Sequence, residues 1–219
     1  MKNKEIILDS ILAQGMLPLF FYEDAGVSLD VIRTLYRAGV RVLEYTNRGK
    51  EALDNFQIIS KAVKQEMPDL HLGIGTIKTE GEAERFVSAG ADFIVSPTID
   101  EGVARAAERH KMLYIPGCMS PTEISLAQRH KAALIKIFPA NILGPAYISS
   151  IRDLFQGQLF MPTGGVEIEV GNISEWFRAG VCAVGMGSKL ISKNVLDNKL
   201  YDELYANTIK ALELVQLSK

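Results

Sequence analysis

The sequence predicts an α/β protein, a (β/α)8 TIM barrel with an additional N-terminal helix. Short, apolar, strand-like runs alternate with helical patterns along the whole chain, and a spacing of about 20 to 30 residues between strands is typical of βαβ units and a parallel sheet. Three helical patterns end in Ala-Gly just before a strand, where glycine supplies the left-handed residue that a short connection needs. Eight such units in one chain favour a closed barrel.

Eight strands are expected, each bounded by Gly, Pro, Ser or Asn. They are Leu17–Tyr22, Arg41–Asn47, His71–Ile77, Phe93–Pro97, Leu113–Cys118, Leu134–Phe138, Leu159–Thr163 and Val181–Met186. The patterns between them, such as LDVIRTLYRAG and EGEAERFVSAG, have the apolar period of helices. A first helix at about residues 4 to 14 would cover the bottom of the barrel, and a last helix at about residues 198 to 217 would close its outer ring.

The whole chain, residues 1–219, is expected to form a single barrel domain. No linker, low-complexity stretch or change in composition divides it. An open doubly wound sheet is the structural alternative, but no Gly-x-Gly-x-x-Gly follows the first strand.

Composition and charge narrow the function classes. The formal net charge is −2, from 24 basic and 26 acidic residues, so no basic surplus points to nucleic acid or to a membrane surface. The N-terminus lacks the features of a signal peptide, and the apolar runs are too short to span a bilayer. The two cysteines match no metal or redox motif, which favours reduced, buried thiols. We therefore expect a soluble cytoplasmic protein.

Lys136 is the first candidate for chemistry. It lies in LIKIFPA, a run that is apolar on both sides, as expected for a parallel strand buried on both faces. Burying an ammonium is costly unless it is paired or neutralised, and a desolvated lysine with a lowered pKa is a nucleophile towards carbonyl carbon. The structural alternative, a lysine that extends its charge to the barrel mouth, is equally compatible with this position.

The second strand supplies a matching partner. Alternation in RVLEYTNRG puts Val42, Glu44, Thr46 and Arg48 on one face. A carboxylate inside a barrel beside a lysine suits a general base or proton shuttle, and Arg48, nearer the mouth, suits a clamp on a substrate carboxylate. An internal ion pair that only holds the barrel together remains the alternative.

Further candidates end the third, fourth and sixth strands. Thr76 ends GIGTI, where Gly73 and Gly75 leave room for a close approach to the backbone. Pro97 ends FIVSP, and Phe138 shares the inward face of Lys136 and would form an apolar wall. Simple packing is the favoured interpretation of Pro97 and Phe138 taken alone.

The last two strands resemble a phosphate site. Thr163-Gly164-Gly165 follows the seventh strand and Gly185-Met186-Gly187-Ser188 follows the eighth, the two positions where barrels often bind phosphate. Glycines let backbone N–H groups converge on the phosphate oxygens. Either glycine motif alone is weak evidence, because glycine turns are common, but their occurrence on these two strands together favours phosphate.

Taken together, these motifs resemble the 2-keto-3-deoxy-6-phosphogluconate (KDPG) and 4-hydroxy-2-oxoglutarate (KHG) aldolases, a class I aldolase family. The resemblance covers nearly the whole chain, and its pieces follow the family's order: VRVLEYTNRG, GIGTI, DFIVSP, IPGCMSPTE, IKIFPA, PTGG and GMGSKL. The E-x-T-x-R and K-x-F-P pieces together are specific, whereas the glycine pieces alone are not.

The resemblance implies a role for each candidate. Lys136 would form a Schiff base and Glu44 would be the general acid/base. Arg48 and Thr76 would hold the pyruvyl carboxylate, with Pro97 and Phe138 shaping the pocket. The phosphate would be bound by Thr163, Gly164, Gly165, Gly187 and Ser188. The family implies a cytoplasmic homotrimer that needs no metal or cofactor and that cleaves phosphorylated 2-keto-3-deoxy sugar acids to pyruvate and glyceraldehyde 3-phosphate, or 4-hydroxy-2-oxoglutarate to pyruvate and glyoxylate.

Departures from the family pattern leave alternatives open. Tyr45 and Asn47 stand where apolar residues are expected, the first strand ends FFYED without a basic residue, and Lys189 follows Ser188 where a bulky apolar residue would be unsurprising. Lys189 would either add positive charge near the phosphate or face solvent. A 2-keto-3-deoxy-6-phosphogalactonate aldolase is one alternative, because C4 stereochemistry depends on fine pocket geometry. Other phosphate-binding barrels, of the epimerase, decarboxylase or thiamine-phosphate synthase type, and a sugar-acid sensor are the others.

Overall fold

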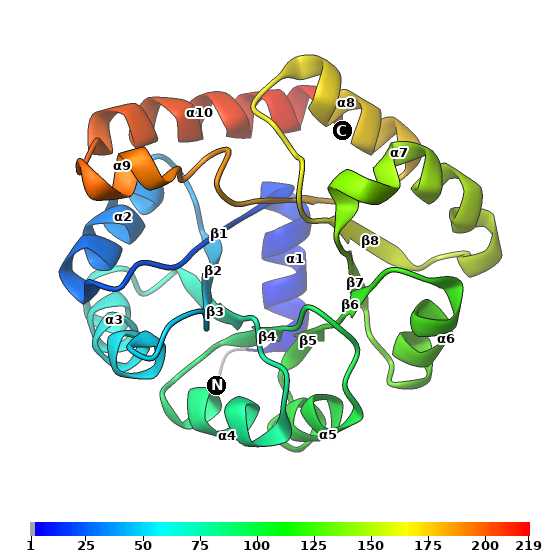
Figure 1. The fold of residues 1–219 in the computed structure, drawn as a ribbon, viewed down its shortest axis with the longest axis horizontal. Coiled ribbons are helices and arrows are strands. Elements are labelled where there is room, and N and C mark those ends of the chain that lie inside the picture. Colours follow the sequence, from blue (N-terminus) through cyan, green and yellow to red (C-terminus); the bar gives the residue numbers. More distant parts are fainter. Residues whose placement is uncertain (1–2) are drawn as a thin grey trace.

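Parallel strands curl into a ring enclosed by helices in the computed structural model, which describes residues 3–219 (Figure 1). The strands are β1 (Met16–Phe20), β2 (Val42–Thr46), β3 (His71–Gly75), β4 (Phe93–Val95), β5 (Leu113–Ile115), β6 (Gly117–Cys118), β7 (Leu134–Ile137), β8 (Leu159–Pro162) and β9 (Val184–Met186). The result is an α/β fold with a curled parallel sheet.

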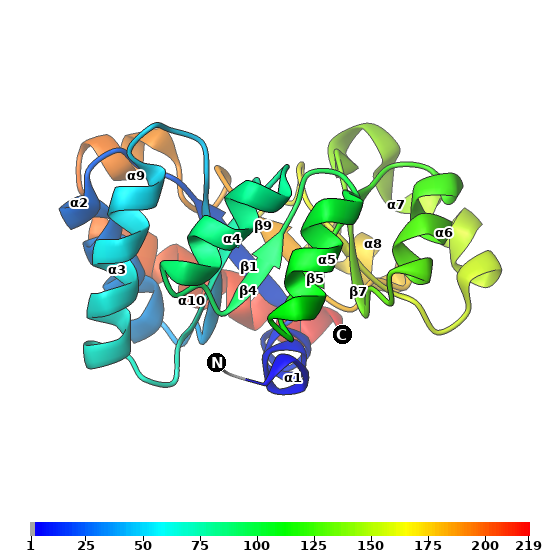
Figure 2. The same cartoon turned by 90° about the horizontal axis from the view of Figure 1, so that it is seen from below.

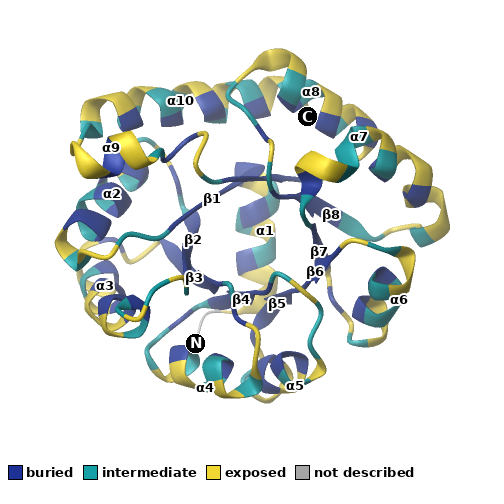
Figure 3. Cartoon of the chain, in the orientation of Figure 1, coloured by how far each residue is buried: buried dark blue, intermediate teal, exposed yellow. Residues whose placement is uncertain are grey.

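Helices pack around the strands, the first across one end of the ring and the others as the outer layer (Figure 1 and Figure 2). They are α1 (Lys4–Gln14), α2 (Ala25–Arg37), α3 (Ala52–Glu66), α4 (Glu80–Ser88), α5 (Glu101–Arg109), α6 (Pro121–Arg129), α7 (Ala140–Ile151), η1 (Arg152–Phe155), α8 (Val170–Ala179), α9 (Lys193–Asp197) and α10 (Tyr201–Ser218). The predicted left-handed glycines are confirmed: φ is 108° at Gly39, 98° at Gly90 and 106° at Gly180. Figure 3 shows that the outer faces of the helices are exposed and their inner faces buried.

The sheet has two hydrogen-bonded parts. Six strands follow the order β5-β4-β3-β2-β1-β9, and three follow the order β6-β7-β8. A parallel bridge from Thr163 to Gly185 joins the end of β8 to β9. Between β5 and β6 lies Pro116, which has no N–H to donate, although its carbonyl accepts a bond from the Lys136 N–H at 2.9 Å. The predicted strand Leu113–Cys118 is thus divided by its own proline.

An apolar core fills the inside of the ring at one end. Its members point inward from the strands or reach up from α1, and they are Ile7, Ile11, Leu17, Val42, Phe93, Val95, Leu113, Ile115, Leu134, Met161 and Ala183. Figure 2 shows α1 lying across this end. Because inward positions recur every second residue, the next inward residue after Val42 is Glu44, and the next after Leu134 is Lys136. The polar side chains therefore lie above an apolar plug.

Gln14 connects α1 to the strands that it covers. Its buried side-chain carbonyl accepts from the N–H groups of Arg41 at 2.6 Å and Val42 at 3.2 Å, and its amide donates to the carbonyls of Met16 and Val42. The side chain of Lys219 donates to carbonyls in the last turn of α1, at 2.8 Å and 2.7 Å. These contacts fix the plug in position.

Several predicted strand boundaries are wrong, and the differences matter for the site. The predicted third, fourth, sixth and seventh strands included Thr76, Pro97, Phe138 and Thr163, but each of these residues lies beyond the end of its strand. Thr76 has φ of 62°, which ends the extended backbone of β3. The last strand begins at Val184 and not at Val181. The last helix begins at Tyr201, because the short helix α9 precedes it.

Among the helices formed by residues 3–219, none has the length and apolar character required to cross a bilayer.

Replacing Gln14 with Met should destabilise the protein by about 2–4 kcal/mol, because buried backbone N–H and carbonyl groups would lose their partners. Gln158 is the matched control: its half-buried amide also donates to backbone carbonyls, including Ala132 at 3.1 Å, but water can replace it. Gln158→Met should cost about 1 kcal/mol or less. Urea denaturation of both variants measures the difference, and equal losses would contradict the role given to Gln14.

Candidate active site

Lys136 lies inside the ring near the carboxyl end of β7. Its side chain is buried, with 4% of the residue exposed, and Nζ lies 5.3 Å from the centroid of the Phe138 ring. Burial lowers the pKa of Lys136; Glu44 opposes that shift and Arg48 adds to it. A lowered pKa increases the fraction of neutral amine, which is the nucleophilic form.

Glu44 lies inside the ring on β2, with only 1% of the residue exposed. Neither carboxylate oxygen has a hydrogen-bond partner among residues 3–219. Burial raises the pKa of Glu44, while the positive charges of Lys136 and Arg48 lower it in part. Because burial favours the neutral form of both groups, Glu44 can hold a proton to donate while Lys136 remains a free amine, and transfer of that proton to Lys136 is disfavoured because it would create a buried ion pair.

A glycine makes room for this carboxylate. Gly75 on β3 neighbours Thr46 on β2, and a Cβ at Gly75 would overlap Oε1 of Glu44. Likewise, a Cβ at Gly73 would overlap the ring of Phe93 in the apolar plug. The sequence indicated that these glycines allow a close approach; the approaching groups are side chains of the protein itself.

Thr76 follows β3 in a strained conformation. Its φ of 62° lies in the left-handed region, which a β-branched residue rarely adopts. Strain of this kind costs about 1–3 kcal/mol and is concentrated at functional sites. Lys136, Glu44, Thr76 and Pro97 are not among the residues that line the cavity described next, although Thr76 and Pro97 follow strands at the end of the ring where Lys136 lies.

A cavity of about 420 Å³ opens at this end of the ring, within the size range of small-molecule sites. Seven of the predicted residues line it: Arg48, Phe138, Thr163, Gly164, Gly165, Gly187 and Ser188. Gly164 and Gly165 have φ of 101° and 75°, and they pack against Asn141 in the first turn of α7. The two glycine loops and Arg48, two residues beyond β2, thus border a single cavity.

Other buried hydroxyls lie at this end of the ring. Thr46, on the same face as Glu44, is fully buried, and its hydroxyl has no hydrogen-bond partner among residues 3–219; the same holds for the hydroxyl of Thr163, which is 5% exposed. Thr46 was noted only as part of a polar face. The signal that distinguishes it, burial without a partner, exists only in the folded protein.

Other reactive side chains lie elsewhere. Burial raises the pKa of the Cys118 thiol to about 12 and that of Cys182 to about 11, so both are poor nucleophiles. A larger cavity, of about 610 Å³, lies at the opposite end between α1, α5 and α6, and His110 and His130 line it. None of the predicted site residues lines it, so its size does not make it the active site.

The Lys136–Glu44 pair should destabilise the fold. We expect the double variant Lys136→Met, Glu44→Gln to have a free energy of unfolding about 1–4 kcal/mol higher than that of the parent at neutral pH, because it removes two buried ionisable groups. Urea denaturation measures this difference. Each single variant should gain less, since it leaves the other group buried without its partner. Equal or lower stability of the double variant would show that the pair holds the barrel together.

The chain as a whole is similar to known proteins. A family model described as "KDPG and KHG aldolase" matches residues 8–207. The KHG/KDPG aldolase of Escherichia coli is 30% identical over 99% of this chain and 100% of its own length. A probable 2-dehydro-3-deoxy-6-phosphogalactonate aldolase of Rhizobium meliloti is 35% identical over a region that covers 63% of this chain and 64% of that relative. The structure of KDPG aldolase from Legionella pneumophila, with pyruvate captured as a covalent carbinolamine, superimposes with a TM-score of 0.83 at 24% identity, covering 91% of this chain and 95% of the other.

Proposed function

The chain belongs to the KDPG and KHG aldolase family and is an aldolase, a carbon–carbon lyase, and we propose that it works through a Schiff base on Lys136. Its proposed reaction is the cleavage of 2-keto-3-deoxy-6-phosphogluconate to pyruvate and glyceraldehyde 3-phosphate, or of 4-hydroxy-2-oxoglutarate to pyruvate and glyoxylate. One observation carries the proposal: Lys136 is buried, with its pKa lowered, within electrostatic reach of the buried carboxyl of Glu44.

In the proposed mechanism the neutral amine of Lys136 adds to the C2 ketone of the substrate, giving a carbinolamine, which loses water to form a protonated imine. Loss of the C4 hydroxyl proton lets the electrons of the C3–C4 bond move into the imine, so the aldehyde leaves and an enamine remains. Protonation of the enamine at C3 and hydrolysis release pyruvate and restore Lys136. The solved Legionella relative, which captured pyruvate as a carbinolamine, is consistent with this order.

Glu44 is the proposed acid and base. It would protonate the departing hydroxyl of the carbinolamine and take up protons in the later steps. Its raised pKa supports this role, because a general acid–base group works best when its pKa is near the working pH. The buried hydroxyl of Thr46, on the same face of β2, is suited to hold a water beside it.

The remaining candidates divide between the two ends of the substrate. Arg48 and Thr76 would hold the pyruvyl carboxylate, with Pro97 and Phe138 as apolar walls. The distal phosphate would be bound by Thr163, Gly164, Gly165, Gly187 and Ser188. The lining of one cavity by Arg48 and by both glycine loops supports this division.

For the fold, we propose that the two parts of the sheet form one closed (β/α)8 barrel, with α1 as the additional N-terminal helix. The Thr163–Gly185 bridge on one side and the continuous chain through Pro116 on the other support closure. We also propose the family's cytoplasmic homotrimer as the working state. Cleavage of the galactonate epimer is a second candidate activity, favoured by the likeness to the Rhizobium relative.

The test of this function is to incubate the protein with pyruvate, reduce with borohydride and locate the adduct by peptide mass spectrometry. A reduced pyruvate adduct on Lys136 is expected. Lys136→Ala should form none and should lose cleavage activity by several orders of magnitude. A folded Lys136→Ala variant that still cleaves substrate would refute the proposal.

Thr76 provides a second test that separates stability from binding. Thr76→Gly should stabilise the protein by about 1 kcal/mol, because glycine adopts positive φ without strain, yet raise the KM for substrate about ten-fold by removing the hydroxyl. Thr98→Gly, in the exposed segment after β4 and without positive φ, is the matched control and should lose stability with little change in KM. Thermal denaturation measures the stability of each variant and steady-state kinetics measures its KM. The same change of stability and of KM in both variants would contradict the role of Thr76.

A further inference from the structure

The charges that line the cavity form two separate cationic groups. Arg48, two residues beyond β2, acts electrostatically on both Lys136 and Glu44 and so belongs to the reacting end. Lys189 and Lys193 follow β9 and line the cavity beside Gly187 and Ser188. No carboxylate occurs among the described residues that line this cavity. The cations that line this cavity favour a substrate with anionic groups.

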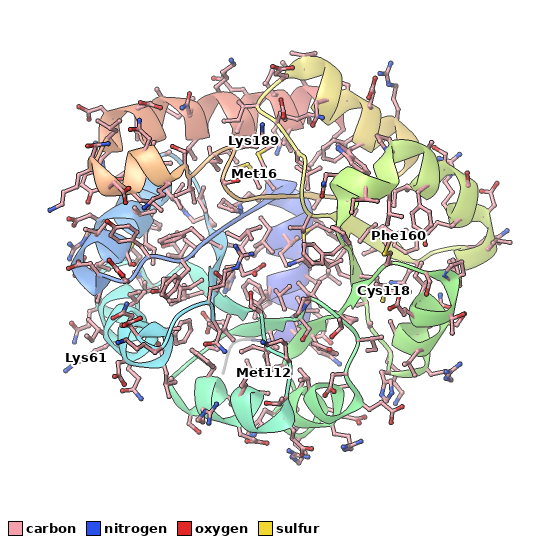
Figure 4. All side chains as sticks on the ribbon, in the orientation of Figure 1. Met16, Lys61, Met112, Cys118, Phe160 and Lys189 are labelled. Carbon is pink, nitrogen blue, oxygen red and sulfur yellow. The ribbon has the colours of Figure 1, made fainter. Side chains whose placement is uncertain are left out.

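Lys189 is held by a carboxylate from the other glycine loop. Its Nζ lies 2.7 Å from Oε1 of Glu167, in the segment between β8 and α8. In Figure 4 Lys189 lies between the segment that follows β9 and the segment that leads to α8. The hydrogen bond to Glu167 raises the pKa of Lys189, which keeps the ammonium charged. The Glu167–Lys189 pair thus spans the two loops that border the proposed phosphate position.

The Glu167 side of this pair is fixed by its own loop. The Glu167 N–H donates to Oδ1 of Asn172 at 2.9 Å, and the Asn172 amide donates to the carbonyl of Gly165 at 3.3 Å. Gly165 in turn packs against Asn141. Lys189, by contrast, is carried by a long flexible side chain that is 55% exposed. These contacts hold the backbone of Glu167, so its carboxylate can remain near the loop when Lys189 turns to another anion.

Lys193, the other distal lysine, is less suited to bind substrate. Its side chain is 87% exposed and pairs with Asp197 of its own helix at 2.9 Å. Asp197 also accepts a hydrogen bond from the Tyr22 hydroxyl at 3.2 Å. This pair lies within one short helix and does not connect the two glycine loops.

From these contacts we infer that Lys189 determines specificity for the distal phosphate, and that Glu167 competes with that phosphate for the lysine. An exposed ion pair is worth about 0–1 kcal/mol, so a phosphate, which carries about −1.5 to −2 charges, can displace the Glu167 carboxylate. An unphosphorylated substrate would leave the pair closed. The inference rests on the proposed function and assigns Lys189 and Glu167 opposite effects on the same ligand.

The experiment measures the rate at which pyruvate condenses with glyceraldehyde 3-phosphate or with unphosphorylated D-glyceraldehyde. Pyruvate is consumed whichever C4 epimer forms, so the assay does not depend on the stereochemistry of the product. Lys189→Met should raise the KM for glyceraldehyde 3-phosphate about five- to ten-fold, with kcat and the KM for D-glyceraldehyde little changed. Lys189→Arg should restore most of the loss. Glu167→Gln should lower the KM for glyceraldehyde 3-phosphate about two- to three-fold, because it frees the lysine.

The matched control is a Lys–Glu pair that does not line the cavity of Arg48 and Lys189. Lys131 Nζ lies 3.9 Å from Oε1 of Glu108, with both side chains largely exposed, at the opposite end of the ring. Lys131→Met and Glu108→Gln should leave both KM values unchanged. Thermal denaturation of each variant verifies folding.

Two results would overturn the inference. One is a Lys189→Met variant whose KM values for the two aldehydes change by the same factor. The other is a Glu167→Gln variant that raises the KM for glyceraldehyde 3-phosphate, since the pair would then act only as a scaffold. Borohydride trapping of pyruvate on Lys136 separates these failures from failure of the proposed function, because pyruvate carries no phosphate.

Discussion

The cost of burying Lys136 and Glu44 together is the constraint on which the rest of this structure depends. A charged ammonium or carboxylate is strongly disfavoured inside a ring of apolar side chains, and Glu44 has no hydrogen bond to offset that cost among the described residues. The same desolvation lowers the pKa of Lys136 and raises that of Glu44. The physical effect that destabilises the fold is therefore the one that prepares a neutral amine beside a proton carrier.

Such a pair is tolerable only because the surrounding structure is held firmly elsewhere. The apolar plug below it is closed by Ile7 and Ile11 of α1, and Gln14 ties that helix to β2 through backbone groups. Above the plug, Gly75 leaves space for the Glu44 carboxylate. Stability thus comes from one end of the ring, and the opposite end is free to carry strain, including the positive φ of Thr76.

The sequence predicted the features that follow from local chemistry. The alternation of strands and helices, the Ala-Gly helix ends and the inward face shared by Lys136 and Phe138 are each encoded within a few residues, and the structure agrees with them. The division of the fifth strand by Pro116 is also encoded locally, because proline has no N–H to donate to a sheet. By contrast, the overlap that a side chain at Gly75 would cause with Glu44, and the pairing of Lys189 with Glu167, depend on residues more than twenty positions apart in sequence. No periodicity encodes such contacts, because they arise from strand register and loop geometry.

Lys189 illustrates how a departure from a family pattern acquires meaning only in three dimensions. In sequence it was a charge where an apolar residue would be unsurprising, and solvent exposure explained it equally well. In the fold it lines the same cavity as Arg48, and the strands that precede the two cations, β9 and β2, are separated by β1. A ligand with a carboxylate at one end and a phosphate at the other satisfies both, whereas Glu167 satisfies only Lys189. Lys189 is neutralised by the Glu167 carboxylate in the absence of phosphate and by the phosphate in its presence. The difference in binding free energy between a phosphorylated and an unphosphorylated substrate therefore depends on how many N–H donors each anion engages, not on charge burial alone.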